Sequence, residues 1–231
     1  MPAEPDCAAP PACPVCEGLG CAPFLEIEGR QYWRCRECRA TFLDPAQCPD
    51  PAAERREYDR HRNEPDDPGY RQFLARLTGP MLERLHPGRQ GLDFGCGPGP
   101  ALAAMLAEAG HEMELWDPIY APDPAVLERT YDFITCTEVV EHMHHPATEF
   151  RRLNTLLRPG GLLGVMTQFQ TDDARFATWH YRRDPTHVVF YRKSTLEFIA
   201  ARMGWRCQFP GHNVAIFTKP ARTPNGDSSS R

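Results

Sequence analysis

The sequence predicts an α/β fold in which helices cover both faces of a mainly parallel sheet of about six to seven strands, the last one antiparallel. Three observations predict it. Short apolar runs alternate with segments of helical periodicity between residues 70 and 219. A glycine-rich turn at 95–99 follows the first of these runs, as expected where a strand turns sharply into a helix. Two pairs of cysteines before residue 43 indicate a small additional metal-binding unit.

The chain has 231 residues, which is enough for one full-sized core with a small appendage. Its net charge of −5 argues against a general attraction to nucleic acid or anionic membranes. There is no apolar run of about 18 residues, and no signal peptide is recognisable at the N-terminus. We therefore expect a cytoplasmic protein with no membrane segment, in which paired cysteines indicate metal rather than disulfides. Nothing in the sequence predicts an oligomeric state.

The N-terminal unit contains two C-x₂-C turns, 13–16 and 35–38, separated by 18 residues. Four thiolates from two such turns suit the tetrahedral coordination of Zn²⁺, whereas a redox dithiol would explain only one pair. Strand-like segments at 24–27 and 31–34 lie between the turns. Residues 13–43 are thus predicted to be a zinc ribbon, preceded by a disordered segment, 1–12. The predicted ligands of a structural zinc ion are Cys13, Cys16, Cys35 and Cys38.

The remaining elements alternate along the chain. Residues 44–69 are a charged, proline-bearing connector that could also cover a bound cofactor, and apolar residues at helical spacing predict a helix over 70–85. The main domain is expected to span 70–219, followed by a disordered tail at 220–231. Its later elements are a strand at 91–94, a helix at 100–109 capped by Gly110, strands at 112–116 and 133–136, a helix at 146–157, a strand at 162–167, a helix opened by a capping box at Ser194 and Glu197, and strands at 205–209 and 214–218.

The glycine turn at 95–99 indicates a nucleotide-containing ligand. Dinucleotide-binding folds use G-x-G-x-x-G and place a pyrophosphate on the helix N-terminus. Here the spacing is G-x-G-x-G, and the preceding Asp93 would repel a pyrophosphate but suit a cationic cofactor. Roughly 20 residues later Asp117 ends the next strand, where a carboxylate can accept ribose hydroxyls. The alternative is a strand-to-helix turn that binds no ligand.

The stretch 92–99 resembles motif I of class I S-adenosylmethionine-dependent methyltransferases, which have a Rossmann-like fold. The resemblance continues through 131–136, 138–142 and 157–161, and small-molecule methylases of quinone and sugar metabolism look most similar. It implies S-adenosylmethionine as the cofactor. The cofactor-binding residues that it implies are Asp93, Gly95, Cys96, Gly97, Gly99, Asp117, Pro118, Thr137 and Glu138. Only about 13 residues separate Asp117 from Tyr131, so the family's third strand is expected to be short or missing.

The acceptor side is predicted to lie after the fourth and fifth strands of the family fold. His187 and His142 are the candidate general bases, because the pKa of histidine lies near the working pH, and the sequence does not rank them. The candidate substrate-binding residues lie in the aromatic segment 176–187: Trp179, His180, Tyr181 and Asp184. A purely structural lid, a cation held by Glu138, Glu141 and His142, and a cation held by His180, Asp184 and His187 remain alternatives.

These features predict an S-adenosylmethionine-dependent methyltransferase that acts on a small molecule by in-line methyl transfer. The main alternative is an rRNA or tRNA methyltransferase that docks RNA through its ribbon. Residues 1–60 contain seven Arg against eleven Asp and Glu, and the Asn/Asp-Pro-Pro-aromatic motif of many base methylases is absent after the fourth strand. Nucleic acid is therefore an unexpected partner. A zinc-ribbon binding protein without catalysis is the third possibility.

Overall fold

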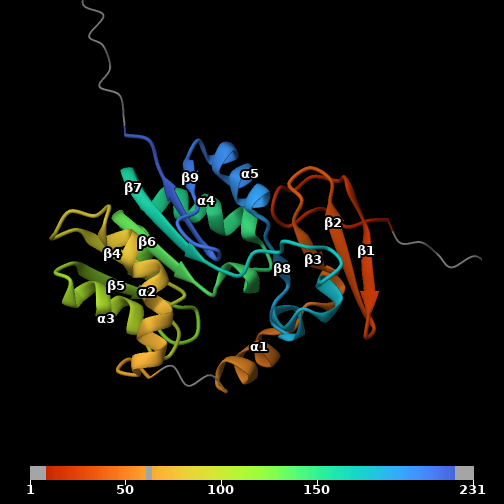
Figure 1. Ribbon diagram of the computed structural model, residues 1–231, viewed down its shortest axis with the longest axis horizontal. Coiled ribbons are helices and arrows are strands. Elements are labelled where there is room, and N and C mark those ends of the chain that lie inside the picture. The colour runs from red at the N-terminus through yellow and green to blue at the C-terminus, as the bar shows by residue number, and fades with distance from the viewer. Residues whose placement is uncertain (1–8, 61–63, 222–231) are drawn as a thin grey trace, which may run out of the picture.

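The computed structural model describes residues 9–60 and 64–221, so the predicted disordered ends lie mostly outside the described residues. The central sheet has the strand order β5-β4-β6-β7-β10-β9 (Figure 1). Its strands are β4 (Gln90–Phe94), β5 (Glu112–Trp116), β6 (Tyr131–Thr137), β7 (Leu157–Met166), β9 (Arg206–Gln208) and β10 (Val214–Thr218). The pairs β4–β5, β4–β6 and β6–β7 are parallel, while β10 is antiparallel to both of its neighbours. The predicted α/β class and the antiparallel last strand are confirmed.

The segment between β5 and β6 forms no strand. Asp117 and Ala121 close a tight turn through two backbone hydrogen bonds of 3.1 Å, and the 3₁₀ helix η2 (Pro124–Glu128) follows. A helix and a returning strand need more residues than this segment has. The third strand, which was predicted to be short or missing, is thus absent from this described segment, and β5 is an edge strand.

Four helices of the main domain flank the sheet: α2 (Pro68–Leu82), α3 (Ala101–Glu108), α4 (Pro146–Leu156) and α5 (Lys193–Met203). The Asp67 carboxylate accepts a hydrogen bond from the Tyr70 backbone N–H, which starts α2 two residues earlier than predicted. The predicted cap of α5 is wrong. The helix starts at Lys193, and the Thr195 hydroxyl accepts a hydrogen bond from the Arg192 backbone N–H. No helix within the described residues is long and apolar enough to cross a membrane.

The two faces of the sheet form two separate cores. Phe133 and Ile216 pack with apolar residues of α2 and α3, whereas the adjacent Ile134 and Phe217 pack with residues of α4 and α5. This separation follows from the alternation of side chains along a strand. The face that carries α4 and α5 also packs against the N-terminal unit.

The N-terminal unit is a second sheet with the order β1-β2-β3-β8. β1 (Cys21–Ile27) and β2 (Arg30–Cys35) form an antiparallel hairpin, and β3 (Thr41–Leu43) pairs with β2. The fourth strand, β8 (Val189–Phe190), comes from the segment between β7 and α5 and pairs antiparallel with β3 (Figure 1). The sequence did not predict β3 or β8, nor α1 (Pro51–Tyr58) in the connector. The domain boundaries at 13, 43 and 70 stay a prediction.

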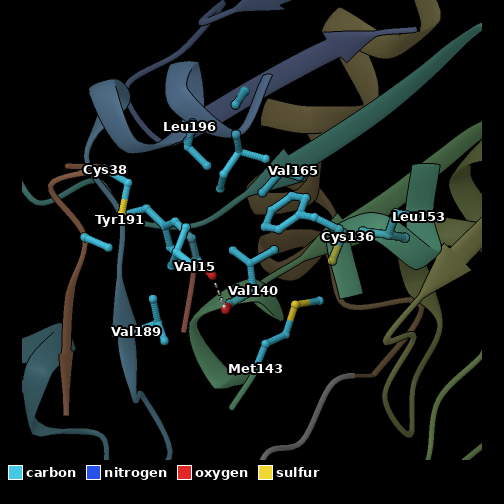
Figure 2. Close-up of a cluster of buried hydrophobic side chains, with 14 of the residues drawn as sticks. Val15, Cys38, Cys136, Val140, Met143, Leu153, Val165, Val189, Tyr191 and Leu196 are labelled. Carbon is cyan, nitrogen blue, oxygen red and sulfur yellow. Dashed lines mark hydrogen bonds between the residues drawn. The ribbon is translucent and has the colours of Figure 1, made fainter. Parts of the chain in front are cut away.

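The two sheets share one hydrophobic core. In Figure 2, Val15 and Cys38 of the N-terminal unit lie with Val140 and Leu196 of the main domain. The buried Tyr191 hydroxyl donates a 2.9 Å hydrogen bond to the Val140 carbonyl oxygen within this cluster. The N-terminal unit is therefore packed into the molecule rather than attached as a separate lobe.

Candidate active site

A cavity of about 930 Å³ opens at the carboxyl ends of β4, β5 and β6, where parallel sheets bind their ligands. Residues of α1 and α2 also line it, among them Glu54, Tyr58 and Tyr70. All nine residues predicted to bind the cofactor line this cavity, and so do His142, His187 and Asp184. The predicted cofactor-binding residues and the candidate bases His142 and His187 therefore line the same cavity.

Gly95 makes the turn after β4 possible. Its φ of +81° lies in the left-handed region, and an added Cβ would lie 2.5 Å from a methyl carbon of Val139. The Gly95 backbone N–H donates to the Trp116 carbonyl oxygen at 2.7 Å, which ties the turn to the end of β5. Only glycine allows this close approach.

Asp117 connects the end of β5 to the glycine turn. Its Oδ2 accepts a hydrogen bond from the Gly97 backbone N–H at 3.1 Å. Its Oδ1 accepts from the backbone N–H groups of Ile119 and Tyr120 at 2.8 and 3.0 Å. These bonds fix the orientation of a carboxylate that also lines the cavity.

Asp93, the fourth residue of β4, is buried and accepts a 2.8 Å hydrogen bond from the Thr135 hydroxyl. Burial, with a smaller contribution from the nearby Asp117 carboxylate, raises the pKa of its carboxyl to about 6. A positive charge in the cavity would favour the ionised form. The site therefore suits a cationic ligand beside Asp93.

Two acidic side chains meet at the Tyr181 hydroxyl. This hydroxyl lies 2.5 Å from Oε1 of Glu141 and 3.2 Å from Oε2 of Glu138. Burial raises the pKa of Glu138 to about 7 and that of Glu141 to about 8. Oε1 of Glu138 and Oε2 of Glu141 have no hydrogen-bond partner among the described residues. The pair can therefore hold or release a proton near neutral pH.

Glu138 has a φ of +51°, a strained value for a residue with a Cβ. Its backbone N–H donates to the Met166 carbonyl oxygen at 2.8 Å, so the chain turns immediately after β6. This turn places the Glu138 side chain in the wall of the cavity.

His142 and His187 lie together, with ring centroids 4.6 Å apart. Nδ1 of His187 lies 2.7 Å from the Tyr181 carbonyl oxygen, so Nδ1–H donates and Nε2 is left as the acceptor. Nε2 lies 3.9 Å from the Asp184 carboxylate. Nδ1 of His142 lies 3.1 Å from the Thr186 carbonyl oxygen. An imidazole held in this tautomer has the form that a general base requires.

The comparisons with known proteins agree with this architecture. A family model described as a methyltransferase domain matches residues 49–208. The chain belongs to this methyltransferase-domain family.

A 77-residue segment of the chain is 31% identical to the ubiquinone biosynthesis O-methyltransferase of Aeromonas salmonicida (strain A449). The match covers 33% of this chain and 32% of that relative, so the chain matches about a third of the relative's length.

Among the solved structures similar to this chain are two methyltransferases. One is the 1,6-didemethyltoxoflavin-N1-methyltransferase of Burkholderia thailandensis with bound S-adenosylhomocysteine, at 17% identity and a TM-score of 0.52, covering 86% of this chain and 99% of that one. The other is the magnesium protoporphyrin IX methyltransferase of Synechocystis PCC 6803, at 18% identity and a TM-score of 0.47, covering 72% and 92%. The first likeness shows that this chain has the Rossmann-like fold of S-adenosylmethionine-dependent methyltransferases.

Of the four predicted substrate-binding residues, one lines the cavity and three do not. Asp184 lines the cavity, whereas Trp179, His180 and Tyr181 do not. Trp179 packs against Phe190, with ring centroids 5.9 Å apart, and His180 is exposed. Tyr181 is buried and reaches the site only through its contacts with the two glutamates.

The sequence predicted that the connector 44–69 could cover the cofactor, but it predicted neither the helix α1 within it nor the contacts of that helix. Glu54 Oε1 lies 2.8 Å from Nε2 of His144, and the Tyr58 ring contacts the His142 ring at 5.3 Å between centroids. The Tyr120 hydroxyl donates to Asp59 at 2.7 Å, just beyond the C-terminus of this helix. These contacts join α1 to both sides of the cavity, and no local motif indicates them. Residues 61–63 of the predicted cover lie outside the described residues.

Among the residues that the structure describes, two groups of side chains could hold a metal ion. Cys13, Cys16, Cys35 and Cys38 are buried, with ligand atoms within 4.8 Å of one another. The Cys13–Cys38 and Cys16–Cys35 sulfur pairs lie 3.5 Å apart, close to the roughly 3.8 Å expected for thiolates about 2.3 Å from a tetrahedral zinc.

The second group brings together Glu141, His142 and His187. It overlaps in part with each of the two cation sites that the sequence left as alternatives. A cation at this position stays a hypothesis.

The buried Asp93 carboxyl generates a prediction about stability. Because its folded pKa of about 6 exceeds the unfolded value near 3.8, folding binds a proton there, and stability is lost as pH rises between these values. Asp93→Asn removes this cost, so the ligand-free variant should be more stable at pH 7 by on the order of 1–3 kcal/mol. Urea denaturation measures the difference, which should shrink towards pH 4. A variant less stable than wild type at pH 7 would contradict this account.

Proposed function

We propose that this methyltransferase transfers the methyl group of S-adenosylmethionine to a small-molecule acceptor in line, with a histidine taking the acceptor's proton. One observation carries the proposal: the glycine turn, two carboxylates and the histidine pair line a single cavity of about 930 Å³. That volume lies within the range of small-molecule and cofactor sites, and both partners of a methyl transfer must share one space. The similar Burkholderia enzyme has S-adenosylhomocysteine and its small-molecule substrate bound, which supports the same arrangement here.

The residues around the glycine turn fit S-adenosylmethionine. This cofactor carries a sulfonium and an ammonium group, which suit a cavity with the buried Asp93 in its wall. The ribose would bind Asp117, whose position is fixed by three backbone N–H groups. Thr137 and Glu138, at the end of β6, would line the rest of the cofactor pocket.

His187 is the proposed general base. Its Nδ1–H is held by the Tyr181 carbonyl oxygen, so Nε2 can accept a proton from an O–H or N–H group of the acceptor. The lone pair released on the acceptor forms the new bond to the methyl carbon, and the bond between sulfur and that carbon breaks. His142, whose ring contacts that of His187, is the second candidate for the same step.

The ribbon favours a small-molecule acceptor over RNA. Tyr32 and Phe42 are fully buried, and the Tyr32 ring contacts the rings of Phe176 and Phe190 at 5.1 and 6.0 Å. The Phe24 ring lies under the Arg34 guanidinium at 4.2 Å. These aromatic rings serve the protein core, so they do not form a stacking platform for bases.

The four cysteines of the ribbon are proposed to hold one structural zinc ion. A Cys₄ set fills the tetrahedral shell and leaves no open position, so this ion would have no catalytic role. Cysteines that bind zinc instead of forming disulfides are typical of a reducing compartment, and a cytoplasmic location is part of this proposal.

Cofactor identity is tested by calorimetry. S-adenosylmethionine or S-adenosylhomocysteine should bind in the micromolar range, about −8 kcal/mol. Asp117→Ala should weaken binding, since it removes the proposed ribose contact and the bond to Gly97. Glu112→Ala, an exposed change outside the cavity on β5, the strand that Asp117 directly follows, is the matched control. Binding of NAD with none of S-adenosylmethionine would refute the assignment.

Zinc is tested by metal analysis of the purified protein. We expect about one Zn²⁺ per chain, lost in the double variant Cys35→Ser/Cys38→Ser, because a structural site needs its full set of thiolates. Cys207→Ser, a half-buried cysteine far from the cluster in sequence, should keep the metal. A metal-free protein with a folded ribbon would show that the interpretation is wrong.

The role of His187 is tested by steady-state kinetics with an identified acceptor. His187→Ala should leave cofactor affinity nearly unchanged and lower kcat by roughly 10²–10⁴-fold if the residue is the base. A residue that only shapes the acceptor site would mainly raise KM. The same assay on His142→Ala distinguishes the two candidates. If both variants turn over at the wild-type rate, neither histidine is the general base and both have only a structural role.

A further inference from the structure

The segment that carries Tyr181, Asp184 and His187 contacts the ribbon on both sides. On the C-terminal side, β8 pairs with β3 through the partners Thr41–Phe190 and Phe42–Val189. This pairing begins two residues after His187, so the ribbon fixes the backbone next to the proposed base.

Val188 joins the two parts of the molecule at this point. Its carbonyl oxygen accepts a 2.8 Å hydrogen bond from the Leu43 backbone N–H of the ribbon. Its own backbone N–H donates to the Glu141 carbonyl oxygen at 2.9 Å. The residue after His187 is thus held between the ribbon and the turn that carries Glu141.

On the N-terminal side the connection is Arg182, the neighbour of Tyr181. This arginine is 1% exposed, and its Nη2 lies 3.2 Å from Oε2 of Glu28 and 3.1 Å from the Ala177 carbonyl oxygen. Its guanidinium also lies over the Tyr32 ring, at 5.9 Å from the centroid. Glu28 and Tyr32 belong to the β1–β2 hairpin and its turn. A buried charge keeps its partners because leaving it unpaired is costly.

The ribbon does not reach the cofactor side. Of the described residues up to 50, none lines the cavity. The glycine turn is held by β5 and by Asp117 instead, through the hydrogen bonds of Gly95 and Gly97. The two ends of the site therefore depend on different parts of the chain.

We propose that the ribbon is the positioning element of the acceptor end: the Arg182–Glu28 pair and the β3–β8 pairing hold Tyr181 and His187 in place. The catalytic meaning of this role rests on the proposed function. The core in Figure 2 supports it, since Val15 and Cys38 of the ribbon pack with Val189 and Tyr191, which follow His187. Zinc in the ribbon would then control the geometry of the acceptor end but not cofactor affinity.

The test uses the full-length, zinc-loaded protein and the variant Arg182→Ala. Hydrogen exchange should show faster exchange of the Val188 amide, on the order of tenfold or more, because its segment loses the ion pair that joins it to the β1–β2 turn. The ¹⁵N signals of the His187 ring should shift, since the bond from Nδ1–H to the Tyr181 carbonyl is disturbed. The Kd of S-adenosylhomocysteine should stay within about twofold of wild type, as the glycine turn is held independently.

The matched control is Arg151→Ala. Arg151 also joins the main domain to the ribbon, through Glu17 at 2.9 Å, but it lies on α4 and does not contact the 181–190 segment. It should change neither the Val188 exchange rate nor the His187 signals. If Arg182→Ala does not fold, Glu28→Gln at an exposed position removes the same ion pair and should produce the same shift. Removing the zinc with a chelator should likewise speed the exchange of the Val188 amide and shift the His187 signals, while the Kd of S-adenosylhomocysteine stays nearly unchanged.

Two results would overturn the proposal. Unchanged Val188 exchange and unchanged His187 signals in the folded variant would show that the ribbon does not position this segment. A parallel loss of S-adenosylhomocysteine affinity would show that the ribbon supports the whole domain rather than the acceptor end. Failure of the wild-type protein to bind S-adenosylhomocysteine would instead contradict the proposed function, and the exchange and ring signals would still test the ribbon's role.

Discussion

The backbone of Val188 is the point on which the acceptor end of the site depends. Its N–H bonds to Glu141 of the main domain and its carbonyl oxygen to Leu43 of the ribbon. Both groups are buried, and leaving either unpaired would cost on the order of 1–3 kcal/mol. His187 is the preceding residue, so the proposed base is positioned where the N-terminal sheet meets the turn after β6, rather than by a free loop.

The cavity wall combines buried acids with very few positive charges. Burial raises the pKa of Asp93 and Glu138, which line the cavity, and that of Glu141, which lies behind the wall, because water is excluded and the ionised forms are disfavoured. Thr135 and Tyr181 supply the hydrogen bonds that partly offset this cost. Such a wall binds a cationic ligand well and an anionic one poorly. This asymmetry fits a sulfonium cofactor and explains why a pyrophosphate-containing cofactor is disfavoured.

The sequence predicted the central sheet because its strands are apolar runs long enough to show a pattern. It predicted the glycine turn from the G-x-G-x-G spacing after the first of these runs. The structure gives the physical reason for a glycine there, since Gly95 has a φ of +81° and lies against Val139. The prediction of a short or missing third strand followed from the small number of residues between Asp117 and Tyr131. The strand β8 has two residues and β3 has three, too few for any periodicity, so their pairing was not predictable. The hydrogen bond from Tyr181 to Glu141 likewise joins residues that lie 40 positions apart in the sequence. Long-range contacts of this kind carry no local signal.

The central claim is that cofactor and acceptor share one cavity, with Asp93 and Asp117 at the cofactor end and His187 at the acceptor end. A crystal structure of the zinc-loaded protein with S-adenosylhomocysteine tests this most directly. The account predicts the ribose hydroxyls on Asp117, the amino group on the side of Asp93, and the sulfur facing the part of the cavity lined by Glu138 and His187. Density for the ligand outside this cavity, or a sulfur turned away from His187, would contradict it.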